Sequence, residues 1–267
     1  MSSRELLLDN GLPPEHVVQL YRPGARSLMR SVGRYLSDGL RRGDAGLVVA
    51  TKEHIEGFLQ QLAQAGLNPD FLQKQGQLLI LDAHRTLAGL MIDNQPSALL
   101  FEKSIGHAVR NFRGQTWGGM LRAYGEMVGV LWSSGQFSAA MALEELWNDL
   151  LKDIPFSLFC SYPIDVFDRS FHRCDVDAVM CSHTHMIPDG IDGDLEFAVS
   201  RAMDDSVGSS HVDWKASFRK AEHPSWAASL KGEALILWIR ENYAQAADDI
   251  LFRARDYFDK AQELSVT

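Results

Sequence analysis

The sequence predicts an α/β fold, with a mostly parallel sheet flanked by helices, and a helical extension at the C-terminal end. Two observations lead to this prediction. Short apolar runs typical of buried strands alternate with segments whose apolar residues recur every three or four positions, as in amphipathic helices. Repeated strand–helix–strand units of this kind favour parallel strands covered by helices on both faces.

The strands are expected where the chain has short runs rich in β-branched and aromatic residues: 16–21, 45–51, 77–82, 120–124 and 156–162. The helices are expected between and after them: 27–43, 52–65, 84–91, 96–112, 127–132 and 137–151. Ser27 is a candidate N-cap of the first helix, and Gly66 is typical of a residue just after a helix end. In the last of these helices, we expect Glu144 to face solvent and Glu145 to lie nearer the apolar side.

The C-terminal quarter differs in composition, because residues 189–267 hold 15 acidic and nine basic residues. We expect three parts along the chain: an α/β domain over 15–188, an acidic linker with a short helix over 189–228, and one long helix over 229–265. The apolar stripe of that helix is wide, which fits a bundle. Two arrangements stay open, a helix folded back on its own domain and a helix that packs against a second chain.

The overall composition excludes several classes of protein. Hydrophobic residues make up 46% and charged residues 23%, which is typical of a folded globular chain. The net charge of −9 disfavours a broad surface for nucleic acid or anionic membranes. No apolar run is long enough to cross a bilayer, and three cysteines fit a reducing compartment. We therefore expect a cytoplasmic protein with no direct nucleic-acid or membrane partner.

The loop after the first strand is the first candidate site, because helix N-termini at the strand carboxyl ends attract anions. A nucleoside triphosphatase would need the pattern GxxxxGK[ST] here, and this loop has one glycine and no such lysine. Arg22 is more typical of a surface arginine, whereas for Arg26 an anion contact and a solvated turn stay equally open. The candidate ligand-binding residues of the loop are Tyr21, Gly24, Arg26 and Ser27.

Two carboxylates also fall at strand ends. Asp82 ends the third strand, where it either faces a site or caps the following helix, and the cap is the more common role. Glu126 follows a strand and Gly125, a position suited to ligand binding or general-base work. One carboxylate without a partner does not make an active site, and no Ser-His-Asp order, HExxH, GxSxG or dinucleotide glycine pattern is present. We expect no catalytic set and a protein that is not an enzyme.

Two cysteines and two histidines close in sequence are the candidates for a metal site. Cys174, Cys181, His183 and His185 supply ligand types that tetrahedral zinc accepts, but their spacing is not that of a recognised finger. An edge strand over 178–183 would place Cys181, His183 and His185 on one face. We favour a buried or hydrogen-bonded role for the histidines and assign no metal.

Four segments together resemble a known family: HVVQLYRPGARSLMRSVGRYLSDGLRRGDAGLVVAT, QLLILDAHRTLAGLMIDNQP, RAYGEMVGVLWSSGQFSAAMALEELWNDL and PFSLFCSYP. They are similar to the MEDS domain, a sensory domain of methanogen and methylotroph proteins that include the dichloromethane-responsive regulator. The resemblance spans about 15–188 and is most specific around Tyr124–Asn148. It implies a relative of the RecA/KaiC nucleotide-binding fold with a degenerate phosphate loop, which agrees with the missing lysine near Gly24.

The resemblance carries over no catalytic set. The positions that match the family's pattern are His16, Gln19, Tyr21, Asp82, Gly125, Glu126, Trp132, Glu144, Glu145, Trp147 and Asn148. Members act as sensor inputs attached to DNA-binding or kinase modules. The segment before the domain is too short for a helix-turn-helix and the tail lacks kinase motifs, so the output is expected from the tail or from a partner.

These observations lead to a functional hypothesis with two alternatives. We expect a sensory or regulatory module that binds a small ligand at the strand carboxyl ends, near Tyr21, Arg26, Asp82 and Glu126. Its C-terminal helix would relay binding to a signalling partner, a second copy of the chain, or both. The ligand stays open, with a nucleotide or another small anionic metabolite as the classes considered. The alternatives are a nucleotide hydrolase or transferase that uses Glu126, and a structural dimeric interaction protein.

Overall fold

The computed structural model describes residues 15–24, 26–114, 119–187, 193–207, 213–228 and 230–264. They form two compact units. Unit 1 contains the described residues up to Pro163 together with Ala178–Ile187. Unit 2 contains Ile164–Asp177 and the described residues from 193 onwards. The boundary thus differs from the expected one at 188, because the 14 residues Ile164–Asp177 belong to unit 2.

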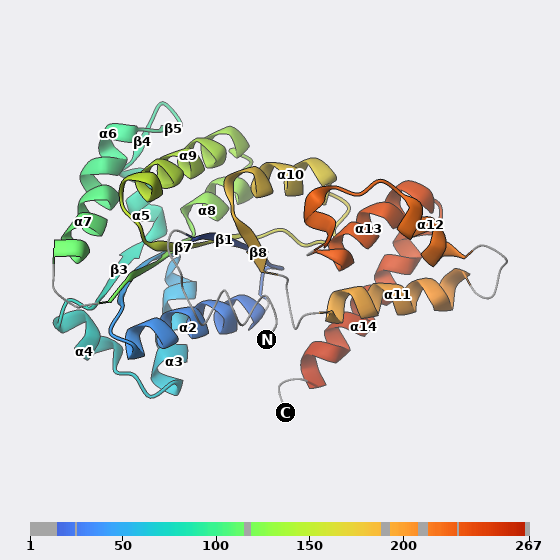
Figure 1. Cartoon of the computed structure of the whole chain (residues 1–267), viewed down its shortest axis with the longest axis horizontal. Coiled ribbons are helices and arrows are strands. Elements are labelled where there is room, and N and C mark those ends of the chain that lie inside the picture. The colour runs from blue at the N-terminus through green and yellow to red at the C-terminus, as the bar shows by residue number, and fades with distance from the viewer. Residues whose placement is uncertain are drawn as a thin grey trace. The chain divides into compact units, whose positions relative to one another are not determined.

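A six-stranded parallel sheet forms the centre of unit 1, with the strand order β3-β2-β6-β7-β1-β8 (Figure 1). Its strands are β1 (Glu15–Leu20), β2 (Ala45–Ala50), β3 (Leu78–Asp82), β6 (Leu121–Gly125), β7 (Ser157–Tyr162) and β8 (His185–Ile187). The predicted fold class is confirmed, and each of the five predicted strands is present. Strands β2, β6 and β7 are buried along their whole length, as their continuous apolar runs indicate.

Helices cover both faces of this sheet (Figure 1). One face carries α2 (Arg26–Arg41), α3 (Lys52–Gln64) and α4 (Pro69–Lys74). The other carries α5 (Ala83–Ala88), α6 (Ala98–Phe101), η1 (Glu102–Gly106), α7 (His107–Gly114), α8 (Met127–Ser133) and α9 (Phe137–Asp153). The boundaries follow local signals: α3 is followed by Gly66 at φ +78°, a left-handed conformation that glycine adopts without strain.

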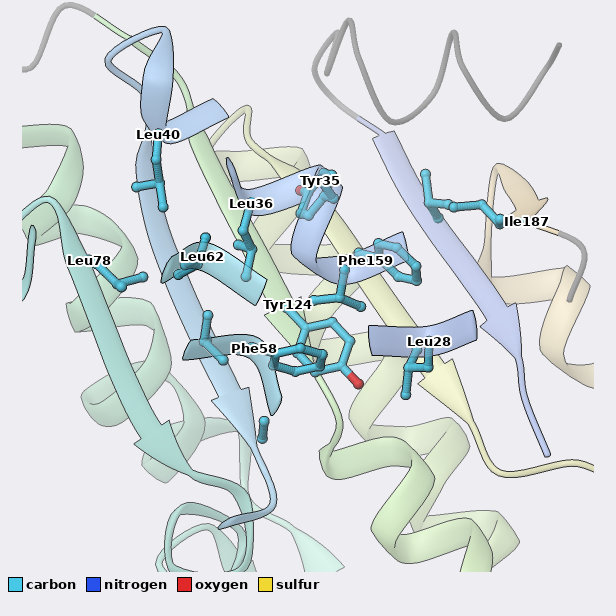
Figure 2. Packing of buried hydrophobic residues seen from close by; sticks show 14 of the residues in the cluster. Leu28, Tyr35, Leu36, Leu40, Phe58, Leu62, Leu78, Tyr124, Phe159 and Ile187 are labelled. Carbon is cyan, nitrogen blue, oxygen red and sulfur yellow. The ribbon is translucent and has the colours of Figure 1, made fainter. Parts of the chain in front are cut away.

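The core between the sheet and α2, α3 and α4 is built from interlocking aromatic and aliphatic side chains. Figure 2 shows Phe58 of α3 next to Tyr124 of β6, and their rings meet edge to face at 5.0 Å. Phe159 of β7 lies on the other side of Tyr124, with ring centroids 5.9 Å apart. The apolar residues that α2 presents every four positions pack around these rings; they are Leu28, Val32, Leu36 and Leu40. The helical periodicity in the sequence therefore identified this core face correctly.

Three local features differ from the sequence-based expectations. Strand β3 is only half-buried, because it lies at the edge of the sheet. A short hairpin of β4 (Met91–Ile92) and β5 (Gln95–Pro96) interrupts the segment between α5 and α6, with Asp93 and Asn94 both at positive φ in its turn. Helix α2 begins at Arg26, so Ser27 lies inside its first turn and is not the N-cap.

A buried ion pair holds the amino-terminal edge of the sheet together. Arg122 of β6 is 1% exposed, and its Nε donates to Asp44 Oδ2 at 2.9 Å. The same guanidinium donates to the carbonyl of Tyr35 in α2, also at 2.9 Å. Asp44 in turn accepts a hydrogen bond from the backbone N–H of Met120. The pair thereby fixes the starts of β2 and β6 relative to α2.

Unit 2 is helical: α11 (Asp194–Val207), α12 (Trp214–Lys220), η2 (Ser225–Ala228), α13 (Lys231–Asn242) and α14 (Ala247–Leu264). The segment 164–177 belongs to it through side-chain contacts. Trp226 donates its indole N–H to Asp177 at 2.7 Å, and Arg255 pairs with Asp165. None of the described helices in either unit combines the length and the hydropathy that a membrane span requires.

The single long helix expected over 229–265 is two helices, α13 and α14. The chain leaves the first helix at Tyr243, whose φ of −127° and ψ of 37° are not helical. The sequence did not reveal the break, because α13 is apolar on almost all sides. Whichever side of α13 is chosen, its apolar residues line up with the apolar stripe of α14 as if the two were one helix. The apolar stripe of α14, with Ile250 and Ala254, packs against α11 of the same chain. Of the two arrangements left open, packing within the chain is the one observed for this stripe.

Asp44→Ala is expected to lower the free energy of unfolding by about 3–5 kcal/mol, because it removes one partner of a buried, hydrogen-bonded ion pair. Asp149→Ala removes an exposed ion pair with Lys152 and is expected to cost less than about 1 kcal/mol. Urea denaturation of both variants measures the difference. A cost below about 1 kcal/mol for Asp44→Ala would show that this pair does not hold the edge.

Candidate functional site

The connections that leave β2 and β6 run in opposite directions along the sheet. These strands are neighbours, but the chain continues from β2 to β3 at one edge and from β6 to β7 on the other side. The helices α3 and α8 that follow them lie on opposite faces of the sheet (Figure 1). Such a reversal opens a crevice at the strand carboxyl ends, which is where open α/β sheets bind ligands.

A cavity of about 510 Å³ lies at this position. Its walls come from the segments that follow five of the six strands. The lining residues are Tyr21, Pro23, Gly24, Thr51, Lys52, Glu53, His54, His84, Glu126, Gly129, Val130, Ser133, Ser134 and Pro163. Three of the six predicted ligand-binding residues, Tyr21, Gly24 and Glu126, are therefore brought together here.

Glu126 is the buried carboxylate of the cavity wall, at 3% exposure. Its Oε2 accepts a hydrogen bond from the backbone N–H of Thr51 at 2.8 Å, and its Oε1 accepts one from the Thr51 hydroxyl at 3.3 Å. Nδ1 of His54 lies 2.7 Å from Oε1, in an ion-pair contact that is not aligned as a hydrogen bond. Thr51 is the N-cap of α3 and makes no side-chain cap bond, so Glu126 supplies the negative charge at this helix end.

Tyr21 forms the neighbouring wall of the cavity. Burial raises the pKa of its hydroxyl above the usual value, and the carboxylates of Glu126 and Glu53 raise it further. The phenol is therefore neutral and can both donate and accept a hydrogen bond. Its ring meets that of His54 edge to face, with centroids 5.7 Å apart. Tyr21, His54 and Glu126 thus form one polar wall.

Two glycines shape the approach to the cavity. Gly24 has a φ of +81° and lies in open space, so the turn before α2 requires its left-handed backbone. Gly129 in α8 is needed for a different reason, since a Cβ at this position would lie 2.6 Å from the carbonyl oxygen of Ser161. The close approach of α8 to β7 therefore depends on the missing side chain.

The other predicted site residues lie elsewhere. Asp82 caps α5 by accepting a hydrogen bond from the backbone N–H of Arg85 at 2.7 Å, and it does not line the cavity. The cap, the commoner of its two expected roles, is confirmed. Ser27 is buried in the first turn of α2, with a hydroxyl that makes no hydrogen bond. Arg26 begins α2, but its side chain lies outside the described residues.

Sequence reasoning missed the part of the wall that follows β2. Lys52, Glu53 and His54 had been considered only as the start of a helix, and His84 only as the start of α5. Their position in the sequence could have identified them as site residues, because they come directly after a strand that is covered on both faces. The carboxyl ends of neighbouring parallel strands meet at one edge, so these side chains belong to the same site as Glu126.

The four candidate metal ligands do not come together. The predicted edge strand 178–183 is wrong, because these residues end α10 (Arg173–Ser182) and the strand β8 follows it. Cys174 and Cys181 are exposed on α10, and His185 is exposed at the start of β8. His183 is buried, and its Nδ1 lies 2.6 Å from the carbonyl of Val179, which confirms the buried and hydrogen-bonded role for this histidine.

Glu144 is fully buried, whereas Glu145 is exposed, so the expectation for this pair of glutamates is reversed. The Tyr162 hydroxyl donates to Glu144 Oε1 at 2.6 Å. Burial alone would raise the pKa of this carboxyl, but His183 and His16 outweigh burial and hold the pKa well below its usual range. His16, Glu144, Cys160 and His183 are the residues in the described part of the chain that could together hold a metal ion.

A second cavity of about 710 Å³ lies within unit 2, where the sequence predicted a linker. Trp214 and Phe218 of α12 and Leu235 of α13 give it a largely apolar lining, and Lys215 and Arg219 lie at its wall. The missed signal is the spacing of Trp214 and Phe218, which places both on one side of a short helix.

Comparison with protein families matches residues 15–184 to MEDS, the "MEthanogen/methylotroph, DcmR Sensory domain". The chain belongs to the MEDS family. No curated protein matches the chain. The match covers nearly all of the β-sheet, whereas α11 to α14 lie beyond it; the relationship of the MEDS domain to RecA and KaiC stays a prediction.

Two of the three thiols are expected to react with a disulfide reagent in the folded MEDS protein, and all three after denaturation. Cys174 and Cys181 are exposed, whereas Cys160 is fully buried and burial raises the pKa of its thiol well above the usual value. Colorimetric thiol titration with and without denaturant gives the count. Rapid reaction of three thiols in the native protein would contradict the burial of Cys160.

Proposed function

We propose that this chain is a cytoplasmic sensory or regulatory module that binds a small polar metabolite in the strand-end cavity of its MEDS domain. The observation that carries the proposal is the position of the cavity at the reversal between β2 and β6, in a domain of a sensory family. The three unpaired cysteines support a reducing compartment.

The polar wall supports a ligand with both acceptor and donor groups. Lys52 and His84 offer positive or donating groups at the exposed side, and Glu126 holds the deeper, negative side. Lys52 is also the first residue of α3, whose N-terminus favours anions. The described part of the loop after β1 brings no lysine toward the cavity, so a small carboxylate or phosphate monoester fits better than a triphosphate.

We further propose that the helices of unit 2 carry the output to a second copy of the chain or to a signalling partner. The apolar stripe of α14, for which packing against another chain was one of two open arrangements, packs against α11. An interface therefore has to use other side chains. Phe252 on α14 is 76% exposed and Phe197 on α11 is 65% exposed, which is unusual for phenylalanine. A ligand changes such an interface only if it binds one arrangement of the protein more tightly than the other.

Nucleotide hydrolysis with Glu126 as the general base is the less favoured alternative. Both carboxylate oxygens already accept hydrogen bonds from Thr51, and His54 lies against one of them. A base that activates water must direct a lone pair at the water, and these contacts occupy up to three of the roughly four acceptor positions of the carboxylate. The expectation that the chain is not an enzyme remains a proposal, which the absence of magnesium-dependent ATP turnover would support.

Ligands found by a thermal-shift screen of nucleotides and small metabolites are expected to lose their effect in Ser134→Trp, which fills the strand-end cavity from an exposed position. At 100 times its dissociation constant, a ligand stabilises the folded protein by about 2.7 kcal/mol, which is a readily measured shift. Ala228→Trp fills the unit 2 cavity in the same way and serves as the matched control.

If the ligand still stabilises Ser134→Trp but no longer stabilises Ala228→Trp, the binding site lies in unit 2 and the proposal for the strand-end cavity is wrong. Lys52→Ala is expected to weaken binding of an anionic ligand, and Lys74→Ala, at an exposed position on α4 outside the cavity, is expected to leave it unchanged. Equal effects of the two lysine variants would argue against an anion at the α3 N-terminus.

Phe252→Ser is expected to lower the molar mass measured by light scattering from that of a dimer toward that of a monomer. Phe71→Ser, which changes a phenylalanine of α4 that is 57% exposed in unit 1, is expected to leave the mass unchanged. A wild-type mass equal to one chain at all accessible concentrations would exclude the homodimer. The output would then be proposed to pass to a different signalling protein.

A further inference from the structure

Four ionisable side chains from four different elements meet inside unit 1, on the sheet face covered by α9. They are His16 of β1, Glu144 of α9, Cys160 of β7 and His183 of the α10–β8 connection. All four are buried, and their nitrogen, oxygen and sulfur atoms lie within 4.8 Å of one another. None of them lines the strand-end cavity.

Several distances between these atoms are close to those of neighbouring ligands around one ion. His16 Nε2 lies 3.3 Å from Glu144 Oε2 and 3.3 Å from Cys160 Sγ. His183 Nε2 lies 3.3 Å from Glu144 Oε1, and Cys160 Sγ lies 3.9 Å from Glu144 Oε2. Ligands at the zinc–nitrogen and zinc–sulfur bond lengths, arranged as a tetrahedron, are about 3.3–3.6 Å apart. Three of these four distances match that spacing, and the distance between Cys160 and Glu144 is longer.

Each histidine is held so that its Nε2 faces the centre of the cluster. Nδ1 of His16 lies 2.8 Å from Oδ1 of Asn148, one turn beyond Glu144 in α9. The Asn148 amide is oriented by a second bond, from its Nδ2 to the Ser182 carbonyl at 3.1 Å, which leaves its oxygen for His16. His183 directs Nδ1 to the Val179 carbonyl in the same way. Both rings thus place Nδ1 against an oxygen acceptor and leave Nε2 facing the cluster, which is the orientation of metal-binding histidines.

A simple ion pair does not account for the cluster as well. Nε2 of His183 is buried and makes no hydrogen bond, although it lies 3.3 Å from a carboxylate oxygen. A metal ion at the centre of the cluster would give this buried nitrogen a partner. A carboxylate and a thiolate would together balance a divalent cation, which removes the cost of burying unpaired charge.

We propose that His16, Glu144, Cys160 and His183 form a closed tetrahedral binding site for one divalent transition metal ion, and that this ion is Zn²⁺. Imidazole and thiolate ligands favour zinc over magnesium or calcium. Four protein ligands leave no open position, which is typical of structural zinc. The ion would join β1, β7, α9 and the α10–β8 connection. This inference does not depend on the ligand proposed for the strand-end cavity.

The first test uses the wild-type full-length chain. Elemental analysis of protein purified without chelators is expected to give one zinc per chain, and removal with a chelator is expected to lower the melting temperature reversibly. Cobalt(II) added to the metal-free protein is expected to give the intense visible bands of tetrahedral cobalt and a thiolate charge-transfer band, saturating at one equivalent. A wild-type protein that binds no cobalt with these bands would overturn the proposal.

Variants then identify the ligands. Cys160→Ser is expected to lose the charge-transfer band, whereas the double variant Cys174→Ser/Cys181→Ser, which changes only exposed thiols, is expected to keep it. Glu144→Gln is expected to weaken cobalt binding and its neighbour Glu145→Gln to leave it unchanged. Asn148→Ala, which removes only the hydrogen bond to His16 and its own link to Ser182, is expected to weaken binding about 10–100-fold.

Each outcome of the variant experiments supports or overturns the proposal. A charge-transfer band that survives in Cys160→Ser, or that disappears in Cys174→Ser/Cys181→Ser, would place the metal elsewhere and overturn the assignment. Failure of Cys160→Ser or Glu144→Gln to fold leaves the wild-type cobalt spectrum and the Asn148→Ala affinity as the deciding results.

Discussion

A carboxylate buried against a sheet must be matched by partners, because an uncompensated charge in the interior costs several kcal/mol. Among the described residues of unit 1, Asp44, Glu126 and Glu144 each meet this constraint by joining separate elements. Asp44 holds Arg122 at the amino edge, and Glu126 holds Thr51 and the start of α3 at the carboxyl edge. Glu144 of α9 contacts side chains from β1, β7 and the α10–β8 connection. Apolar packing alone would not specify these junctions, since it is not directional.

The candidate ligand cavity and the histidine–cysteine cluster share structural supports. Tyr21 continues β1, which carries His16, and Pro163 continues β7, which carries Cys160. A metal ion that ties β1 to β7 would therefore fix two of the segments that form the cavity wall. Rigid support of this kind preorganises a binding site and lowers the entropy lost when a ligand binds.

Much of the sheet could be predicted, because strands covered on both faces are apolar without interruption, and the strand ends then located Tyr21 and Glu126 at the site. The predictions that failed concern residues whose environment is set by contacts between distant segments of the chain. Glu144 was assigned to solvent because a helical pattern treats any charge as exposed, and its partners come from three other elements. The end of α10 was assigned to a strand because its short run of small and β-branched residues does not distinguish the two structures. The break at Tyr243 was invisible beside a helix buried on all sides.

Anomalous diffraction from crystals of the full chain, recorded on both sides of the zinc absorption edge, tests the account of Glu144 most directly. We predict one strong peak above the edge, bounded by Nε2 of His16, Nε2 of His183, Sγ of Cys160 and the Glu144 carboxylate, which vanishes below the edge. Clear density for these four side chains without an anomalous peak, and with Nε2 of His183 hydrogen-bonded to Glu144 or to water, would contradict it.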